Sequence, residues 1–175
     1  LVGRISVTLS ALSSHTGGFD DYAFLDVTDF MIEAVEHWQR LGIRFHAIYS
    51  GFLGSHRQVD IVKRLIEYQR KNDPLVVVDP VLADEGKLYA TMTEDMVKSM
   101  RELIKEADII TPNLTEASLL LDREYNPNLE EAELKQWLLD LADMGPETVV
   151  ITSAPLNRPG NVTSVVAYTK KGKRF

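Results

Sequence analysis

The hydrophobic pattern along the chain alternates between short apolar runs and longer amphipathic segments. Four runs have the length of buried strands, at residues 45–49, 75–78, 108–111 and 148–152. The run Leu75-Val-Val-Val78 is continuous rather than alternating, which is typical of a parallel strand covered on both faces. Residues 164–168 form a further strand-like run, and the basic residues 170–174 after it read as the tip of a hairpin turn.

Apolar residues at helical spacing predict a helix in each segment between these runs. Two helices carry only a periodicity signal, and two others also carry a capping signal. The apolar positions are Met31, Val35 and Trp38; Val59, Val62 and Ile66; Met96, Met100, Leu103 and Ala107; and Leu134, Trp137, Leu138 and Leu141. Thr91 with Glu94 predicts a capping box for the third helix, and Asn128 with Glu131 predicts a cap for the fourth. A further helix over residues 114–121 follows Asn113, its predicted N-cap.

Repeated strand–helix–strand order predicts an α/β fold of three layers, in which a mostly parallel central sheet has helices on both faces. In such sheets ligands bind just beyond the carboxyl ends of the strands. The residues that follow each strand therefore matter most. They are residues 50–54, 79–84, 112–116 and 153–155, and we expect them to open on one rim.

Composition narrows the class of protein. The length of 175 residues predicts a single domain, and 19 basic against 26 acidic residues give a net charge of −7. An acidic chain argues against a nucleic-acid partner. The chain has no cysteine, which excludes disulfides and thiolate metal sites. No apolar run is long enough to span a membrane, so we expect a cytoplasmic protein.

Several polar residues at the expected rim could carry chemistry, although each also has a structural interpretation. Asp79 and Asp84 could share Mg²⁺ directly or through water, or Asp79 could cap a turn. Asn113 and Glu116 are expected in the first turn of a helix, where an anion is favoured. Thr152 and the residue after it could bind phosphate or cap a turn. The four histidines lack the spacing of zinc ligands.

Five stretches together resemble a known family. They are Ser13-Ser-His-Thr-Gly-Gly-Phe19, Tyr49-Ser-Gly-Phe-Leu-Gly54, Val78-Asp-Pro-Val-Leu-Ala-Asp84 with Gly86-Lys-Leu-Tyr89, Ile110-Thr-Pro-Asn-Leu-Thr-Glu-Ala117 and Val149-Val-Ile-Thr-Ser153. In order and spacing, the chain resembles the pyridoxal (pyridoxine, pyridoxamine) kinase family of the ribokinase-like superfamily. The resemblance runs from about Ala11 to the end.

The resemblance implies transfer of the γ-phosphoryl group of ATP to the 5′-hydroxyl of a vitamin B6 form, in salvage to pyridoxal 5′-phosphate. It also implies a homodimer and a role for each matching residue. The pyridine substrate would be bound by Thr16, beside His15 and Gly17, and Tyr89 would border the site. The residues at ATP would be Asp79, Asn113, Glu116, Thr152 and Ser153. Mg²⁺ would be organised by Asp84 and Glu116, and a monovalent cation, K⁺ or Na⁺, would be held by Thr111 and Thr152.

Two departures from the family pattern carry further expectations. The family has a late Gly-x-Gly-Asp motif that supplies an anion hole and the catalytic base, and these 175 residues contain none. The family pattern also has a stretch between the parts that match Ser10 and Ala11, and this sequence lacks it. We therefore expect the sequence to be part of a longer ribokinase-like domain, with little kinase activity of its own and no catalytic base within it.

Two other functions remain open on the sequence. Hydroxymethylpyrimidine (phosphate) kinases of thiamine synthesis share the Asp-Pro-Val and Thr-Pro-Asn elements found at Asp79 and Thr111. A catalytically inactive vitamer-binding protein would also explain the lack of the base motif. Competition between pyridoxal and the pyrimidine alcohol would separate the first of these from a pyridoxal kinase.

Overall fold

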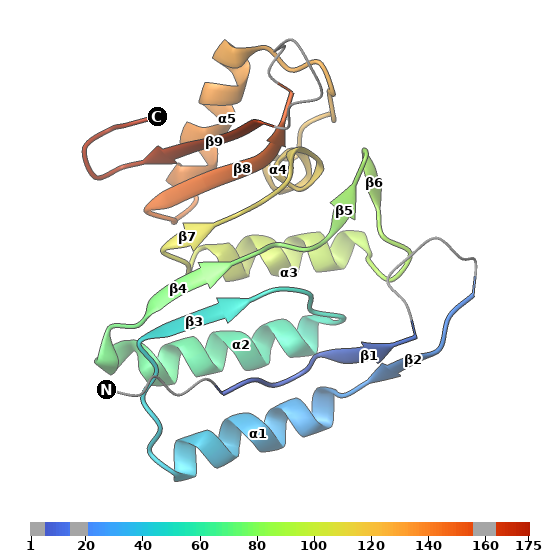
Figure 1. The fold of residues 1–175 in the computed structure, drawn as a ribbon, viewed down its shortest axis with the longest axis vertical. Helices are drawn as coiled ribbons and strands as arrows, with labels where there is room; N and C mark the ends of the chain where they lie inside the picture. The colour runs from blue at the N-terminus through green and yellow to red at the C-terminus, as the bar shows by residue number, and fades with distance from the viewer. Residues whose placement is uncertain (1–5, 15–20, 156–163) are drawn as a thin grey trace.

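The computed structural model describes residues 6–14, 21–155 and 164–175. Its centre is a five-stranded sheet in the order β3 (Ala47–Ser50), β4 (Leu75–Val78), β7 (Ile109–Ile110), β8 (Thr148–Ala154) and β9 (Ser164–Thr169) (Figure 1). The first four strands run parallel, and β9 returns antiparallel beside β8. The mostly parallel α/β sheet is therefore confirmed, with each predicted strand within a few residues of its place. The basic run after β9 forms the predicted turn, closed by a bridge between Thr169 and Arg174.

The predicted helices also form within the described residues. They are α1 (Thr28–Arg40), α2 (His56–Gln69), α3 (Glu94–Ile104), α4 (Leu114–Leu121) and α5 (Glu131–Asp143), and a short 3-10 turn, η1 (Arg70–Asn72), follows α2. No helix within these ranges has the length and apolar character needed to cross a lipid bilayer.

Two of the predicted helix caps are wrong. Thr93, not Thr91, caps α3, because its extended backbone directly precedes the helix and its hydroxyl accepts the N–H of Met96. At the start of α5, Glu130 occupies the cap position and no side chain makes a capping hydrogen bond. Glu131 and Glu133 in the first turn of α5 interact favourably with the positive end of the helix dipole.

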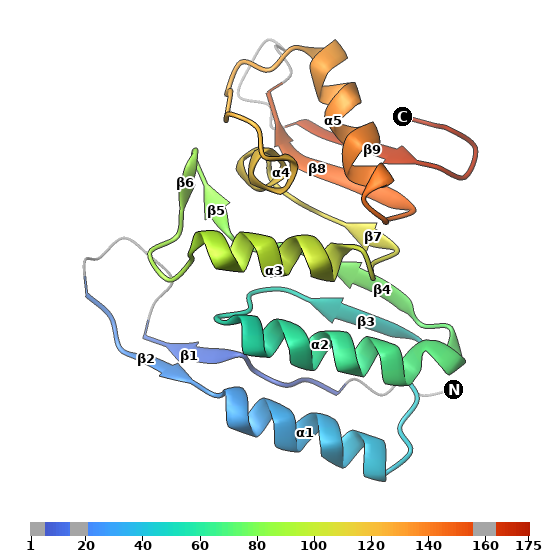
Figure 2. The ribbon, with the colours of Figure 1, turned by 180° about the vertical axis from the view of Figure 1, so that it is seen from behind.

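All the described helices lie on one face of the sheet, which is evident when Figure 2 is compared with Figure 1. The parallel strands follow one another in chain order, so right-handed crossovers place every connecting helix on the same side. Strand burial agrees: Ile48 and Val76 are buried, whereas Tyr49 is 68% exposed and Leu75 is 46% exposed. The described residues thus form two of the three predicted layers. The expectation of helices on both faces is not met within them.

Two hairpins outside the main sheet were not predicted. One pairs β1 (Ala11–Ser13) with β2 (Phe24–Asp26), and the other pairs β5 (Ala83–Asp84) with β6 (Lys87–Leu88). Strands of two or three residues are too short to give a periodic signal. Both hairpins stand on the side to which the arrows of β3 and β4 point (Figure 1). They therefore extend the rim where the predicted site lies.

The adjacent isoleucines of β7 test which face of the sheet is covered. Ile110 is fully buried against the helices, whereas Ile109 is only half-buried on the opposite face. We expect Ile110→Ala to lower the free energy of unfolding by about 3–4 kcal/mol, and Ile109→Ala by about 1 kcal/mol, because only the first leaves a cavity in the core. Urea denaturation of the two variants measures both losses. Equal losses would contradict a sheet covered on one face.

Candidate active site

Backbone hydrogen bonds join the ends of the parallel strands into a continuous rim. The N–H of Asp79 donates to the Ser50 carbonyl (2.8 Å), and the N–H of Thr111 donates to the Val78 carbonyl (3.1 Å). The N–H of Thr152 donates to the Pro112 carbonyl (2.9 Å). Asp79 and Thr111 directly follow β4 and β7, whereas Thr152, predicted as the last residue of its strand, lies two residues before the end of β8. The strand ends therefore meet along one edge of the molecule.

A reciprocal capping box fixes the start of α4 at this rim. The Oδ1 atom of Asn113 accepts the N–H of Glu116 (2.9 Å), and the Oε2 atom of Glu116 accepts the N–H of Asn113 (2.8 Å). The same two side chains reach the loop after β4: Asn113 Nδ2 donates to the Ala83 carbonyl (2.7 Å), and Glu116 Oε1 accepts the Leu82 N–H (3.1 Å). The predicted N-cap role of Asn113 is confirmed. Both side chains hold the loop that carries Asp79 and Asp84.

Burial makes the Glu116 carboxyl group unusual. Glu116 is 4% exposed, and loss of hydration raises the pKa of its carboxyl group to about 7. The hydrogen bonds from the backbone of Asn113, Leu82 and Ala83 act in the opposite direction, and the charge of Asp79 adds to the increase. The group therefore takes up or releases a proton near neutral pH.

This pKa predicts a pH dependence of stability. Between about pH 4.5 and 7 the unfolded chain releases the Glu116 proton while the folded protein retains it, so stability falls as the pH rises. The loss reaches up to about 3 kcal/mol. Glu116→Gln should remove this slope, although its amide cannot accept both backbone N–H groups. Urea denaturation from pH 5 to 8 measures the effect.

Glu102→Gln is the matched control for that experiment. Glu102 is exposed, and its hydrogen bond with Lys105 lowers its pKa, so it should not titrate in this window. Its replacement should leave the slope of the wild-type protein unchanged. A slope that persists in Glu116→Gln would contradict the assignment to Glu116.

Carboxylates and two tyrosines gather around the loop after β4. The hydroxyl of Tyr49 donates to Asp79 Oδ2 (3.0 Å), and Asp84 lies in β5, where its Oδ1 accepts the Glu85 N–H. Partial burial raises the pKa of Tyr89, and so do the charges of Asp84, Glu116 and Asp79. Tyr89 is therefore within electrostatic range of all three acids, and its place at the border of the site stays a prediction. Tyr49 was given no role on the sequence, because only the tertiary fold brings it to Asp79.

The described residues contain no group of three or more His, Cys, Asp or Glu side chains close enough to bind one metal ion directly. Mg²⁺ commonly keeps several of its waters and takes only one or two carboxylates from the protein. The acids at this rim therefore fit a hydrated Mg²⁺ that is also held by phosphate. They do not form an all-protein metal cage.

The end of β8 departs from regular strand geometry. The register with β9 shifts between Ile151 and Ala154, and Ser153 has a left-handed backbone with φ of 55°. The side chain of Ser153 is exposed at the rim, next to Thr152, which bridges to Asn113. Bulges of this kind often redirect side chains near functional sites. Nothing in the sequence signals the left-handed conformation.

The predicted substrate residues His15, Thr16 and Gly17 lie outside the described residues. The strands that flank them in the sequence, β1 and β2, are described and stand beside the rim. Their role at the substrate therefore stays a prediction.

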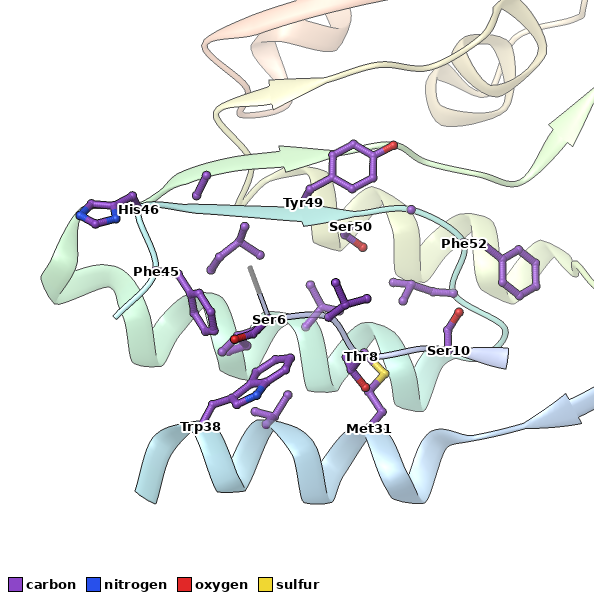
Figure 3. A pocket seen from close by; sticks show the side chains of 18 of the residues that line it. Ser6, Thr8, Ser10, Met31, Trp38, Phe45, His46, Tyr49, Ser50 and Phe52 are labelled. Atoms are coloured by element: carbon purple, nitrogen blue, oxygen red, sulfur yellow. The ribbon is translucent and has the colours of Figure 1, made fainter. Parts of the chain in front are cut away.

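A hollow of about 520 Å³ lies away from the acids, along the outer edge of β3 (Figure 3). It lies between that strand, α1 and residues 6–10, and Trp38, Phe45 and Met31 contribute to its lining. The hydroxyls of Thr8 and Ser50 are buried at this hollow without a hydrogen-bond partner. Only its end at Ser50 and Gly51 approaches the rim, so the hollow is not the predicted nucleotide site.

Comparison with known proteins places this geometry in a family. A family model described as phosphomethylpyrimidine kinase matches residues 13–175. The chain belongs to the phosphomethylpyrimidine kinase family. Human pyridoxal kinase is 38% identical over 122 residues, which are 66% of this chain and 36% of that protein. The chain thus spans about a third of the curated relatives that it matches. The resemblance to pyridoxal kinases is confirmed.

Solved structures of other proteins match the fold over most of the chain. A candidate phosphomethylpyrimidine kinase from Bacteroides thetaiotaomicron, solved in a form with pyridoxal, is 45% identical with a TM-score of 0.89. The match covers 94% of this chain and 58% of that one. A Plasmodium falciparum chain, solved with the ligands AMP-PNP and PL, is 28% identical with a TM-score of 0.67, over 84% of this chain and 53% of that one. The ribokinase-like fold is therefore shown.

Proposed function

We propose that the protein serves in ATP-dependent phosphorylation of the 5′-hydroxyl of pyridoxal, pyridoxine or pyridoxamine. The observation that carries the proposal is the rim, where Asp79, Asn113 and Thr152 meet on hydrogen-bonded strand ends. The Bacteroides thetaiotaomicron relative solved with pyridoxal supports the substrate class. The Plasmodium falciparum relative solved with AMP-PNP supports a nucleotide triphosphate.

The roles proposed for the rim residues follow from their geometry. Asp79 on the loop after β4 and Asp84 in β5 each offer carboxylate oxygens and would organise hydrated Mg²⁺ at the phosphates. Asn113 and Glu116 would act mainly by fixing that loop, since their side-chain groups already bind backbone atoms. Thr152 and Ser153 would contact the nucleotide from the end of β8.

The remaining roles rest on the family resemblance. Thr111 and Thr152 would hold a monovalent cation, and Thr16 with His15 and Gly17 would bind the vitamer. We also propose a homodimer that acts in the cytoplasm. In phosphoryl transfer the protein contributes mostly positioning and neutralisation of charge, so a rim of rigid strand ends suits the reaction.

Hydroxymethylpyrimidine phosphorylation is the second candidate. The description of the family model and the name of the Bacteroides thetaiotaomicron relative both favour it. The pyridoxal kinases among the relatives and the pyridoxal in that same structure favour a B6 vitamer. Isothermal titration with pyridoxal and with hydroxymethylpyrimidine separates the two. At least tenfold tighter binding of the pyrimidine would overturn our choice.

The two aspartates that flank β4 test the nucleotide site. Asp79 follows the strand at the carboxyl rim, whereas Asp73 precedes it at the opposite edge. We expect Asp79→Asn to weaken Mg²⁺–ADP binding at least tenfold, because a charge that neutralises or orients the metal is lost. Titration calorimetry measures the affinity.

Asp73→Asn is the matched control. Asp73 has a left-handed backbone, which asparagine adopts readily, so the fold should be kept. Mg²⁺–ADP affinity should stay within twofold of wild type. Equal weakening in both variants would place the nucleotide elsewhere.

The absence of a Gly-x-Gly-Asp motif from these 175 residues predicts a catalytic defect. With no group assigned as base for the substrate hydroxyl, we expect turnover of pyridoxal by this polypeptide to stay at background, even where ligands bind. Formation of pyridoxal 5′-phosphate followed by absorbance measures it. Clear ATP-dependent product would show that another group in this chain supplies the base.

A further inference from the structure

A single buried side chain connects the β1–β2 hairpin to the rim. Gln58 lies in the first turn of α2 and is fully buried. Burial of an amide group costs free energy unless its donors and acceptor are all hydrogen-bonded. Each polar atom of the buried Gln58 side chain therefore needs a hydrogen-bond partner.

Every polar group of the Gln58 side chain is used, and each binds a different segment. Its Nε2 donates to the Ser10 carbonyl (2.8 Å) and to Thr28 Oγ1 (2.8 Å). Its Oε1 accepts the N–H of Gly54 (2.7 Å). Ser10 directly precedes β1, Thr28 begins α1 just after β2, and Gly54 belongs to the loop that follows β3.

The sequence alone points to a different role for this glutamine. Ser55-His-Arg-Gln58 has the spacing of a capping box, in which the glutamine would bind back to the N–H of Ser55. Ser55 does cap α2, but the Gln58 side chain does not bind back to the Ser55 N–H. It binds Gly54, Ser10 and Thr28 instead. Its role is therefore tertiary rather than local.

Other contacts reinforce the same junction. The Ser10 carbonyl that accepts from Gln58 also accepts the N–H of Val27 (3.3 Å), which closes the base of the hairpin. The ring of Phe24 in β2 lies 3.9 Å from the position that a Cβ atom on Gly54 would occupy. The hairpin thus rests on the loop after β3, and Gln58 binds both sides of the contact.

We propose that Gln58 is a positioning residue that fixes the β1–β2 hairpin against the loop after β3 and thereby sets affinity for the vitamer. The link to the vitamer rests on the proposed function, because β1 and β2 lead in sequence to and from the predicted substrate residues. The mechanical part, that Gln58 holds the hairpin, stands on the described contacts alone.

The chain supplies a matched control on the same helix. Gln69, at the other end of α2, is 1% exposed and also binds three groups. Its Nε2 donates to the Ile43 carbonyl (2.8 Å), and its Oε1 accepts from the Phe45 N–H and from Asn72. These partners lie before β3 and before β4, at the edge of the sheet opposite the rim. Replacing either glutamine removes a similar set of buried hydrogen bonds.

The experiment compares Gln58→Leu with Gln69→Leu in the same 175-residue protein. Hydrogen exchange without ligand should show at least tenfold faster exchange of the Gly54, Val27 and hairpin amides in Gln58→Leu only. In Gln69→Leu the faster amide should be Phe45. Titration with pyridoxal should give at least fivefold weaker binding in Gln58→Leu and wild-type affinity in Gln69→Leu, while Mg²⁺–ADP affinity is unchanged in both.

Each outcome decides a separate point. Faster exchange of the hairpin in both variants, or in neither, would overturn the positioning role. Hairpin loosening in Gln58→Leu with unchanged pyridoxal affinity would overturn the link to the vitamer. If the wild-type protein binds no pyridoxal, the proposed function fails, and the exchange pattern still decides whether Gln58 holds the hairpin. If Gln58→Leu does not fold, Gln58→Glu replaces it, because glutamate keeps the acceptor for the Gly54 N–H and loses both donors. Amide exchange should then become faster at Val27 but not at Gly54. Faster exchange at both amides, or at neither, would overturn the positioning role.

Discussion

The hydrogen bonds of the Glu116 carboxylate are the constraint on which the candidate site depends. One buried group accepts N–H groups from the start of its own helix and from the loop after β4. Asn113 completes the junction through the Ala83 carbonyl. Asp79, which is half-buried, and Asp84, which is exposed, lie on either side of Leu82 and Ala83, so the buried acid Glu116 helps to fix the positions of both. Glu116 thus has a structural role, whereas Asp79 and Asp84 carry the chemical role that we propose.

The one-sided layering of the molecule follows from the order of its strands. Because β3, β4, β7 and β8 are added in chain order, each crossover falls on the same face. The other face presents Tyr49, Leu75 and Val165 to solvent in the described part of the chain. Tyr49 on that face also reaches Asp79 at the rim. The open face and the candidate site are therefore adjacent.

A buried glutamine at each end of α2 binds a different set of neighbouring segments. Gln69 joins the loops at the edge where the strands begin, and Gln58 joins the hairpin to the edge where they end. Such buried amides add little net stability, but they disfavour alternative packings in which they would lose partners. A helix whose apolar face packs in the core can in this way also fix the register of segments at both of its ends.

The sequence by itself determined the alternation of strands and helices, the rim residues and the N-cap at Asn113, because these depend on local spacing and on the rule that parallel strand ends converge. The family resemblance also followed from the order of short motifs. Only the tertiary structure decided that the described helices cover one face, that Thr93 rather than Thr91 caps α3, and that two short hairpins extend the rim. It also decided that the Tyr49 hydroxyl binds Asp79, and that the Gln58 side chain binds Ser10, Thr28 and Gly54 rather than the N–H of Ser55. The bonds from Tyr49 to Asp79 and from Gln58 to Ser10 and Thr28 join residues at least 30 positions apart. Such partners form hydrogen bonds only when folding brings them within about 3 Å of one another, so local spacing does not predict them.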